Sequence, residues 1–218
     1  MKKKLIIFGT GTLAEIAYFY FANDSDYEVV GFTSDKSQQF YGDFLLEKPV
    51  YTWDQLLTSY EKEEIEIFVA IGYRKTNQVR RERFDQVKQA GFKLANYISS
   101  RAINYSKKIG ENCFILENNV LQPFCEVGDC VTMWSGNHLG HHSVVGDNCF
   151  ITSHVVISGK CIIGSNTFIG VNSSLHDNVH VGKFCVIGAG SIVSESCEDR
   201  TVFLPSKSEK RTIKRDII

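Results

Sequence analysis

Residues 157–170 read Ile-Ser-Gly-Lys-Cys-Ile-Ile-Gly-Ser-Asn-Thr-Phe-Ile-Gly, with an isoleucine at positions 157, 163 and 169. The same spacing runs without a break from Ile103 to Val193, where every sixth residue is aliphatic or methionine. One face of a helix recurs every 3.6 residues and one face of a strand every two, so neither element has a period of six. Such a period, with glycine after many of the aliphatic residues, predicts a chain that winds as a β-helix, in short flat turns around a triangular prism.

A second inward position follows four residues after each aliphatic residue and holds mostly small side chains. Equivalent cysteines on this register are 36 residues apart, which corresponds to two coils or about 10 Å, too far for a disulfide. The sequence has no Cys-x-x-Cys pair and no Cys/His spacing typical of zinc, so we expect no metal. The cysteines are interpreted as small buried hydrophobic residues of a protein from a reducing compartment. Six of the seven lie on the register: Cys113, Cys125, Cys149, Cys161, Cys185 and Cys197.

Composition narrows the class of partner. The 218 residues carry a formal net charge of −1, which argues against binding to nucleic acid or to a membrane surface. The basic start, Met1 to Lys4, precedes an apolar run that is too short for a signal peptide and ends at Gly9. No segment approaches the length of a transmembrane helix. We therefore expect a cytoplasmic protein.

The first hundred residues show a different pattern, that of a small α/β domain. Strands are expected at 4–8, 27–32 and 66–72, and helices after Gly11 and over 76–90 with Gly91 as C-cap. This alternation predicts a parallel sheet with right-handed crossovers. The predicted organisation is a half-Rossmann-like nucleotide-sugar-binding α/β domain at 1–98, a β-helix at 99–198 and a C-terminal tail at 199–218.

The turn after the first strand contains Gly9, Gly11 and Ala14, the spacing of a dinucleotide-binding fingerprint, and Asp35 follows the second strand. Glycines let the backbone approach a phosphate, and the start of the helix offers amide donors. Fewer than one hundred residues precede the repeats, so only half of a dinucleotide-binding fold fits. A nucleotide or nucleotide sugar is therefore favoured over NAD, and a glycine-rich turn without a ligand is the alternative.

All six histidines lie in the repeat region, and none occupies an inward position. They must therefore point outward or lie at corners, where they meet either solvent or a ligand. The densest group is at 133–143, where Trp134, Asn137, His138, His141 and His142 occur within nine residues. Such a density is unusual for a plain solvated surface and predicts a functional site.

Three segments resemble a known family, the left-handed β-helix sugar acyltransferases. They are Gly140–Gly146, Ile169–Ser173 and Ile187–Ser191. The closest subgroup joins a small nucleotide-binding domain to hexapeptide repeats, and includes the N-acetyltransferases of bacillosamine and perosamine biosynthesis and the sialic-acid O-acetyltransferase-like proteins. The resemblance spans essentially the whole chain. It implies a left-handed helix, acetyl-CoA as co-substrate, no metal, and a homotrimer with active sites between neighbouring β-helices.

The resemblance also implies roles for individual residues. His141 stands at the position of the catalytic base; the next position, usually Glu or Asp, is His142, which is itself an alternative base. Asn137 or backbone amides at a corner are candidates for stabilising the oxyanion. The remaining assignments concern the two ligands. Acetyl-CoA contacts are expected from Phe150, Gly170, Val171, Gly188 and Ala189, nucleotide-sugar contacts from Gly9, Gly11, Thr12, Ser34 and Asp35, and contacts to CoA or sugar across a subunit boundary from Trp134 and His138.

The expected function is direct transfer of an acetyl group to the amine of a nucleotide-linked sugar, a 4-amino-4,6-dideoxyhexose, in the biosynthesis of O-antigen or another glycan. No Ser-His-Asp or Cys-His signature is present, so no acyl-enzyme is expected. Two alternatives remain: O-acetylation of a sugar or sialic acid, and a non-catalytic hexapeptide-repeat scaffold.

Overall fold

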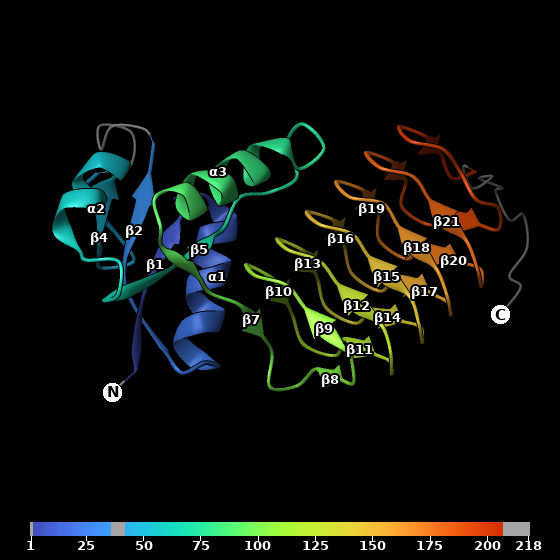
Figure 1. Cartoon of the computed structure of the whole chain (residues 1–218), viewed down its shortest axis with the longest axis horizontal. Coiled ribbons are helices and arrows are strands. Elements are labelled where there is room, and N and C mark those ends of the chain that lie inside the picture. The colour runs from blue at the N-terminus through green and yellow to red at the C-terminus, as the bar shows by residue number, and fades with distance from the viewer. Residues whose placement is uncertain (1, 36–41, 207–218) are drawn as a thin grey trace, which may run out of the picture.

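The computed structural model describes residues 2–35 and 42–206, and it divides into an α/β domain and a solenoid (Figure 1). The α/β domain contains one sheet in the order β3-β4-β2-β1-β5-β6, parallel throughout except for the β3–β4 pair. Its strands are β1 (Lys3–Phe8), β2 (Tyr27–Ser34), β3 (Phe44–Leu45), β4 (Lys48–Thr52), β5 (Ile65–Val69) and β6 (Lys93–Leu94); its helices are α1 (Thr12–Asn23), α2 (Trp53–Ser59) and α3 (Gln78–Gln89). The expected parallel sheet is confirmed.

Helix α3 begins two residues later than the sequence pattern suggested. Lys75, Thr76 and Asn77 have φ values of 51°, 49° and 66°, so these three residues form a left-handed turn that a right-handed helix cannot include. At the other end, Gly91 has φ of 85° and follows the C-cap Ala90, as expected for a C-terminal glycine. The left-handed turn directs α3 along the side of the solenoid (Figure 1).

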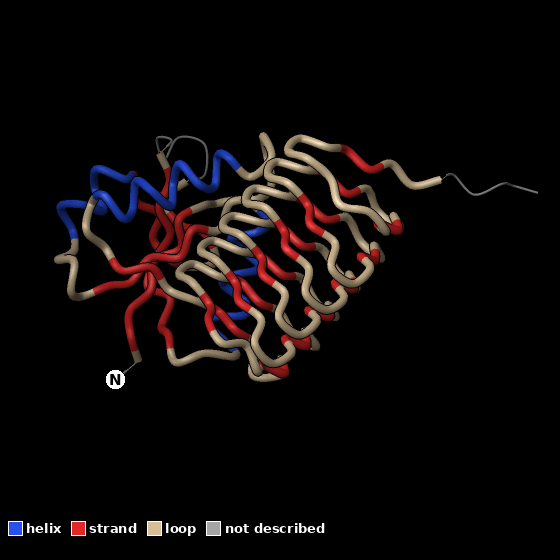
Figure 2. The backbone as a smooth tube through the Cα atoms, turned by 45° about the vertical axis from the view of Figure 1, so that its right-hand side comes forward, coloured by secondary structure: helices blue, strands red, loops and turns tan. Residues whose placement is uncertain are grey.

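The solenoid is a parallel β-helix with three faces, and Figure 2 shows its coils stacked with the strands in register. Between residues 108 and 193, neighbouring strands on one face are 18 residues apart, so three hexapeptides make one coil. We call the three sheets the first, second and third faces. The first face contains β7 (Tyr97–Ile98), β10 (Phe114–Ile115), β13 (Thr132–Met133), β16 (Phe150–Ile151), β19 (Phe168–Ile169), β22 (Val186–Ile187) and β24 (Val202–Phe203); the second contains β8 (Ile103–Asn104), β11 (Val120–Leu121), β14 (His138–Leu139), β17 (Val156–Ile157), β20 (Ser174–Leu175) and β23 (Ile192–Val193); the third contains β9 (Lys108–Ile109), β12 (Glu126–Val127), β15 (Val144–Val145), β18 (Ile162–Ile163) and β21 (His180–Val181).

The interior of the solenoid is filled as the period of six requires. From Ile115 to Val193 the aliphatic residues of the repeat form one continuous buried cluster, and the cysteines of the second inward position lie among them. Ile109 packs against this cluster, whereas Ile103 is 50% exposed and lies outside it. Burial raises the pKa of the Cys113 and Cys149 thiols to about 12. These thiols therefore stay protonated near neutral pH and act as small apolar side chains.

The corners of the prism are sharp turns in which one residue per turn is left-handed. Asn112, Asn148 and Asn166 share the corner between the third and first faces, with φ values of 55°, 60° and 64°, and Cys130, with φ of 57°, occupies the coil between the first two. Asparagine tolerates this region better than other residues with a Cβ because its short amide bonds to the neighbouring backbone. Repeated asparagine at the corner positions therefore also indicates a β-helix.

The α/β domain is fixed to this same corner by polar contacts. The Arg80 side chain is 1% exposed and donates to Asn148 Oδ1 (3.2 Å), Asn148 O (3.0 Å), Cys149 O (3.1 Å) and Thr132 Oγ1 (3.3 Å). Asn148 Nδ2 in turn donates to the Asn77 carbonyl at 3.0 Å. The α/β domain therefore covers this corner and the first face from β10 to β16, whereas β24 at the end of that face is exposed and the second and third faces are left open.

The solenoid is longer than the expected range of 99–198. It starts with β7 at Tyr97, and β24, inside the expected tail, pairs with β22. The rest of that tail, residues 207–218, lies outside the described residues. Across the described part of the chain, the helices are too short or too polar to traverse a bilayer.

Candidate active site

A pocket of about 550 Å³ opens at the carboxyl ends of β1, β2 and β5. The connection after β1 leads through α1 to β2 on one side of this point, and the connection after β5 leads through α3 to β6 on the other. Ligands of open α/β sheets bind at this kind of position. All five residues expected to contact the nucleotide sugar lie in it, together with two arginines. The lining residues that matter here are Gly9, Gly11, Thr12, Ser34, Asp35, Arg74 and Arg83.

The two glycines of the motif differ in what surrounds them. A Cβ at Gly9, which has φ of 136°, would lie 2.7 Å from the Ala70 carbonyl oxygen, so this glycine is required by packing. A Cβ at Gly11 would meet nothing within 4 Å, and Gly11 is the N-cap of α1 without any side-chain cap. The backbone at Gly11 thus faces open space beside the amides of the first helical turn, as an anion site requires.

Sequence reasoning missed Arg83, which lies on α3 and forms an ion pair with Asp35. Gln86 of the same helix donates to the other carboxylate oxygen of Asp35 at 3.3 Å. Arg74 lines the pocket from the loop after β5. Arg83 is one helical turn from the buried Arg80, and this spacing is the only sequence signal that could have placed it near the sheet edge.

His141 and His142 form a pair at the corner between the second and third faces. Both side chains are exposed, and their Nδ1 atoms are 3.1 Å apart. The His141 amide donates to Gln122 Oε1 at 2.9 Å, and the His142 ring packs on Phe124 with centroids 4.8 Å apart. The prediction that the histidines point outward is confirmed for all six, which are exposed or half-buried.

The contact between the two Nδ1 atoms restricts the tautomers, because one of them must donate and the other accept. If His141 donates from Nδ1, its Nε2 carries a free lone pair and is a proton acceptor. His142 then stands where the family resemblance implies a carboxylate. The arrangement is suited to a general base at His141 Nε2.

The His141 ring lies over Gly159 on the next coil. A Cβ at Gly159 would be 2.8 Å from both Cε1 and Nε2 of His141. A side chain there would displace the imidazole, so the bare α-carbon of Gly159 is part of what positions the ring.

The expectation that Asn137 stabilises an oxyanion is wrong for this structure. Its side chain is 2% exposed, and it donates to the Trp134 carbonyl and accepts from the Val155 amide. Asn137 occupies the second inward position, four residues after Met133, and both ends of its side-chain amide are hydrogen-bonded to the backbone of the solenoid. The small residues expected at that position include a structural asparagine.

Two other expected contact residues turn out to face the α/β domain. Phe150 is 3% exposed and is covered by the ring of Tyr73, with centroids 5.1 Å apart, so its expected contact with CoA is not possible in this conformation. Trp134 packs against the core of the α/β domain. A position facing the sugar or CoA of a neighbouring subunit is therefore incompatible with the Trp134 side chain as it lies here. Both residues belong to the domain boundary.

The remaining expected acetyl-CoA contacts lie together, but not beside His141. Val171 and Ala189 are exposed on successive coils at the corner between the first and second faces, and Gly170 and Gly188 precede them at the ends of β19 and β22. A Cβ at Gly170 would be 2.5 Å from the Ala189 amide, so Gly170 allows the two coils to stack. His138, half-buried on β14, lies on the second face between this corner and that of His141.

The expected site residues thus occupy three different corners of the prism. The nucleotide pocket is lined by α3, which is anchored at the corner of Asn148; His141 and Val171 lie at the other two. A single chain does not bring the three together. Over residues 2–35 and 42–206 there is also no group of three His, Cys, Asp or Glu side chains suited to a metal.

Two models of known protein families match parts of this chain. Residues 4–87 match the PglD N-terminal domain, and residues 160–195 match the bacterial transferase hexapeptide (six repeats). No curated protein matches the chain.

Similar solved structures cover nearly the whole chain. The acetyltransferase domain of PglB from Neisseria gonorrhoeae, in complex with acetyl coenzyme A, is 24% identical, with a TM-score of 0.82 over 93% of this chain and 96% of that one. PerB from Caulobacter crescentus, in complex with CoA and GDP-perosamine, is 21% identical, with a TM-score of 0.78 over 91% and 92%. The expected resemblance and fold class are confirmed. The chain thus joins a segment that matches the PglD N-terminal domain to repeats that match the bacterial transferase hexapeptide, and it shares the left-handed β-helix fold of these acetyltransferase structures.

Proposed function

We propose that this protein is an acetyl-CoA-dependent N-acetyltransferase that acts on the amine of a nucleotide-linked 4-amino-4,6-dideoxyhexose. The observation that carries the proposal is the exposed His141–His142 pair, with its Nδ1–Nδ1 contact of 3.1 Å. It supplies an oriented proton acceptor on the outside of a solenoid whose interior is full. The PglB and PerB structures, with acetyl-CoA in one and CoA and GDP-perosamine in the other, support the choice of both ligands.

In this proposal the nucleotide occupies the pocket at the edge of the α/β sheet. The amides at the start of α1, next to Gly11, bind the phosphates, assisted by Arg74. Asp35 is the acceptor for a ring N–H of the base, and Arg83 holds its carboxylate in place. Because the diphosphate and the sugar extend beyond the nucleotide, the amine of the sugar then lies outside the pocket.

The chemistry we propose is direct transfer. The amine nitrogen attacks the thioester carbonyl, His141 Nε2 accepts a proton, and the carbon–sulfur bond breaks to release CoA, which takes up a proton at sulfur. The cysteines do not compete as nucleophiles: six of the seven are buried, and burial raises the pKa of Cys125 and Cys185 to about 11. No acyl-enzyme is needed.

We further propose that the active site forms between subunits of a homotrimer, because the pocket and His141 lie at different corners of one chain. The open second and third faces carry exposed apolar side chains, among them Ile192 (71%), Val156 (44%) and Ile162 (45%). These are surfaces suited to contact with other copies. Free cysteines and a CoA thioester both fit a reducing cytoplasm, where we expect the reaction to occur.

The test is an acetyl-transfer assay with acetyl-CoA and GDP-, UDP- and dTDP-linked 4-amino-4,6-dideoxyhexoses, following release of the CoA thiol. We expect one nucleotide series to be acetylated on nitrogen, and His141→Ala to lower kcat by about 10²-fold or more. His180→Ala, which removes another exposed histidine on the third face, is the control and should leave the rate unchanged. A His141→Ala rate within tenfold of wild type would move the base to His142.

A further inference from the structure

Asp177 lies two coils beyond His141 at the same corner, on the far side of Gly159. Its Oδ1 accepts from the Gly159 amide at 2.8 Å, and the side chain is exposed. The missing Cβ of Gly159 marks a point that is 2.8 Å from His141 Nε2 and 3.2 Å from Asp177 Oδ1. The His141 ring and the Asp177 carboxylate thus lie next to each other over the buried Gly159, and both side chains are exposed to solvent.

Charge and hydrogen-bonding capacity give this pair of side chains a chemical preference. The contact with His142 occupies His141 Nδ1, so Nε2 is the ring nitrogen of His141 that is left for a ligand. A carboxylate has about four acceptor positions, so Asp177 can hold the Gly159 amide and accept further hydrogen bonds. Two acceptors, one of them anionic, favour a ligand with several N–H donors and a positive charge.

We propose that His141 and Asp177 form a subsite for the protonated amine of the acceptor sugar, so that the protein selects amines over hydroxyls. The inference rests on the proposed acetyltransferase function and adds the reason for N- rather than O-acetylation. A primary amine on a sugar is largely an ammonium ion in neutral water. A hydroxyl has one donor and no charge, so it gains much less from the same carboxylate.

The proton balance follows from this arrangement. Asp177 holds one N–H of the ammonium while His141 Nε2 takes a second proton, leaving a neutral amine whose lone pair attacks the thioester carbon. When the carbon–sulfur bond breaks, the His141 imidazolium returns its proton to the thiolate of CoA. The extra proton on the new amide nitrogen then passes through His141 to water. The products are the N-acetyl sugar, CoA thiol and one proton.

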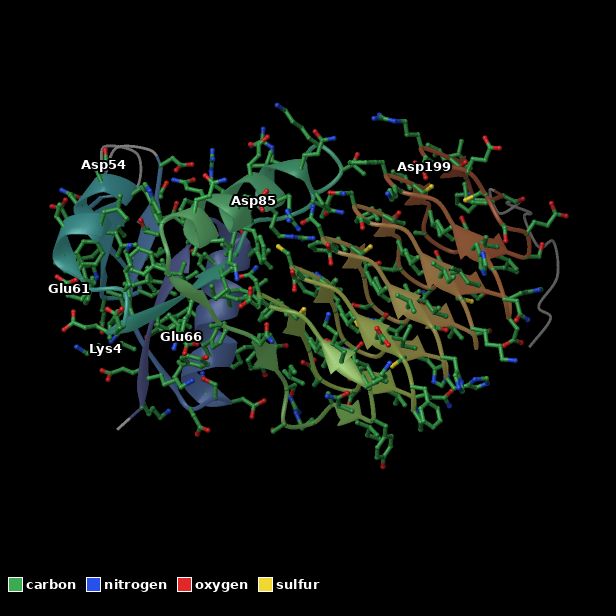
Figure 3. All side chains as sticks on the ribbon, in the orientation of Figure 1. Lys4, Asp54, Glu61, Glu66, Asp85 and Asp199 are labelled. Atoms are coloured by element: carbon green, nitrogen blue, oxygen red, sulfur yellow. The ribbon has the colours of Figure 1, made fainter. Side chains whose placement is uncertain are left out.

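The variant that tests the proposal is Asp177→Asn, because the amide oxygen can still accept from Gly159 while the negative charge is lost. The matched control is Asp199→Asn: Asp199 is also an exposed corner carboxylate, accepts from the Lys183 amide at 2.7 Å, and lies at the end of the solenoid remote from the α/β domain (Figure 3). The ligands are GDP-perosamine and its 4-hydroxy analogue, with the corresponding UDP- and dTDP-linked pairs.

We expect Asp177→Asn to raise KM for the amine by about tenfold or more, the size of one charge-assisted hydrogen bond, with KM for acetyl-CoA unchanged. The affinity for the hydroxyl analogue should stay within twofold, and Asp199→Asn should match wild type. An unchanged KM for the amine, or equal weakening of amine and hydroxyl, overturns the proposal.

A measurement on the wild type alone covers the case in which Asp177→Asn does not fold. Salt weakens the contact between ammonium and carboxylate, so the ratio of amine to hydroxyl affinity should fall as sodium chloride is raised. The diphosphate is common to both members of each pair and cancels from the ratio. A constant ratio contradicts the proposal. If the wild type acetylates none of the amines, the acetyltransferase function itself fails and the subsite with it.

Discussion

At the scale of single residues, Gly9 and Gly11 belong to one motif but have separable roles. Gly9→Ala places a methyl group against the Ala70 carbonyl at a φ of 136°, and we expect it to lower the free energy of unfolding by about 3 kcal/mol. Gly11→Leu meets no protein atom within 4 Å of its Cβ and should cost about 1 kcal/mol or less, mostly as a poorer N-cap. Urea unfolding of the two variants measures this difference.

The same pair separates packing from ligand binding. Gly11→Leu fills the space beside the first turn of α1, so binding of GDP, UDP or dTDP, whichever the wild type prefers by calorimetry, should weaken at least about tenfold. Equal affinity in wild type and Gly11→Leu would show that the nucleotide does not use this turn. Gly9→Ala, where still folded, should bind nearly as well as wild type.

Individual residues were predictable from the sequence when a strict register governed them. The outward direction of His141 and the burial of Cys149 followed from counting in sixes, since the interior has only two positions per turn. The same count places Asn137, four residues after Met133, at an inward position, which is why its side chain is buried and cannot reach an oxyanion. Asp177 stands 36 residues, or two coils, after His141, so the register alone places the two residues at one corner, although it does not show that both contact Gly159.

At the scale of elements, α3 connects the nucleotide pocket to the solenoid through one buried guanidinium. Arg80 has four acceptors, three of them on Asn148 and Cys149. Arg80→Met leaves these buried acceptors without donors, and we expect a loss of about 3 kcal/mol or more in the free energy of unfolding. Arg80→Lys should be nearly as harmful, because an ammonium cannot match the geometry of the fork. Denaturant unfolding provides the measurement.

The neighbouring Arg81 is the control for this prediction. It is part-exposed and pairs with Asp85, one turn along the same helix, where Figure 3 labels it. Arg81→Ala should change the free energy of unfolding by no more than about 0.5 kcal/mol. A loss at Arg81 as large as that at Arg80 would mean that α3 depends on its helical propensity and not on the buried contact.

The elements themselves were predicted unevenly, and the physical reason is the range of the interactions. The solenoid strands follow from local register, and β1, β2 and β5 from apolar runs flanked by glycine. The position of α3 over the corner of Asn148 depends on contacts between residues about 70 positions apart, such as Arg80 with Asn148. A periodic pattern carries no information on such pairs, which is why Phe150 and Trp134 were assigned to ligands although they face the α/β domain.

At the scale of the whole molecule, the separation of the nucleotide pocket from His141 predicts that two chains share each active site. Gly11→Leu and His141→Ala should each be inactive as pure trimers, since one blocks the pocket and the other removes the base. When the two are co-expressed in equal amounts, random assembly pairs an intact pocket with an intact His141 in about one quarter of the sites. We expect about that fraction of the wild-type rate, with light scattering confirming trimers.

Mixing wild type with a chain that carries both substitutions separates this arrangement from one within a single chain. If each site takes its pocket and its base from different subunits, random trimers again keep about one quarter of the sites, whereas a site within one chain keeps about one half. No activity in the first mixture together with one half in the second would assign pocket and base to the same subunit. In that case α3 would have to release its hold on Asn148 for the sugar to reach His141, and the contacts of Arg80 would open during turnover rather than stay fixed.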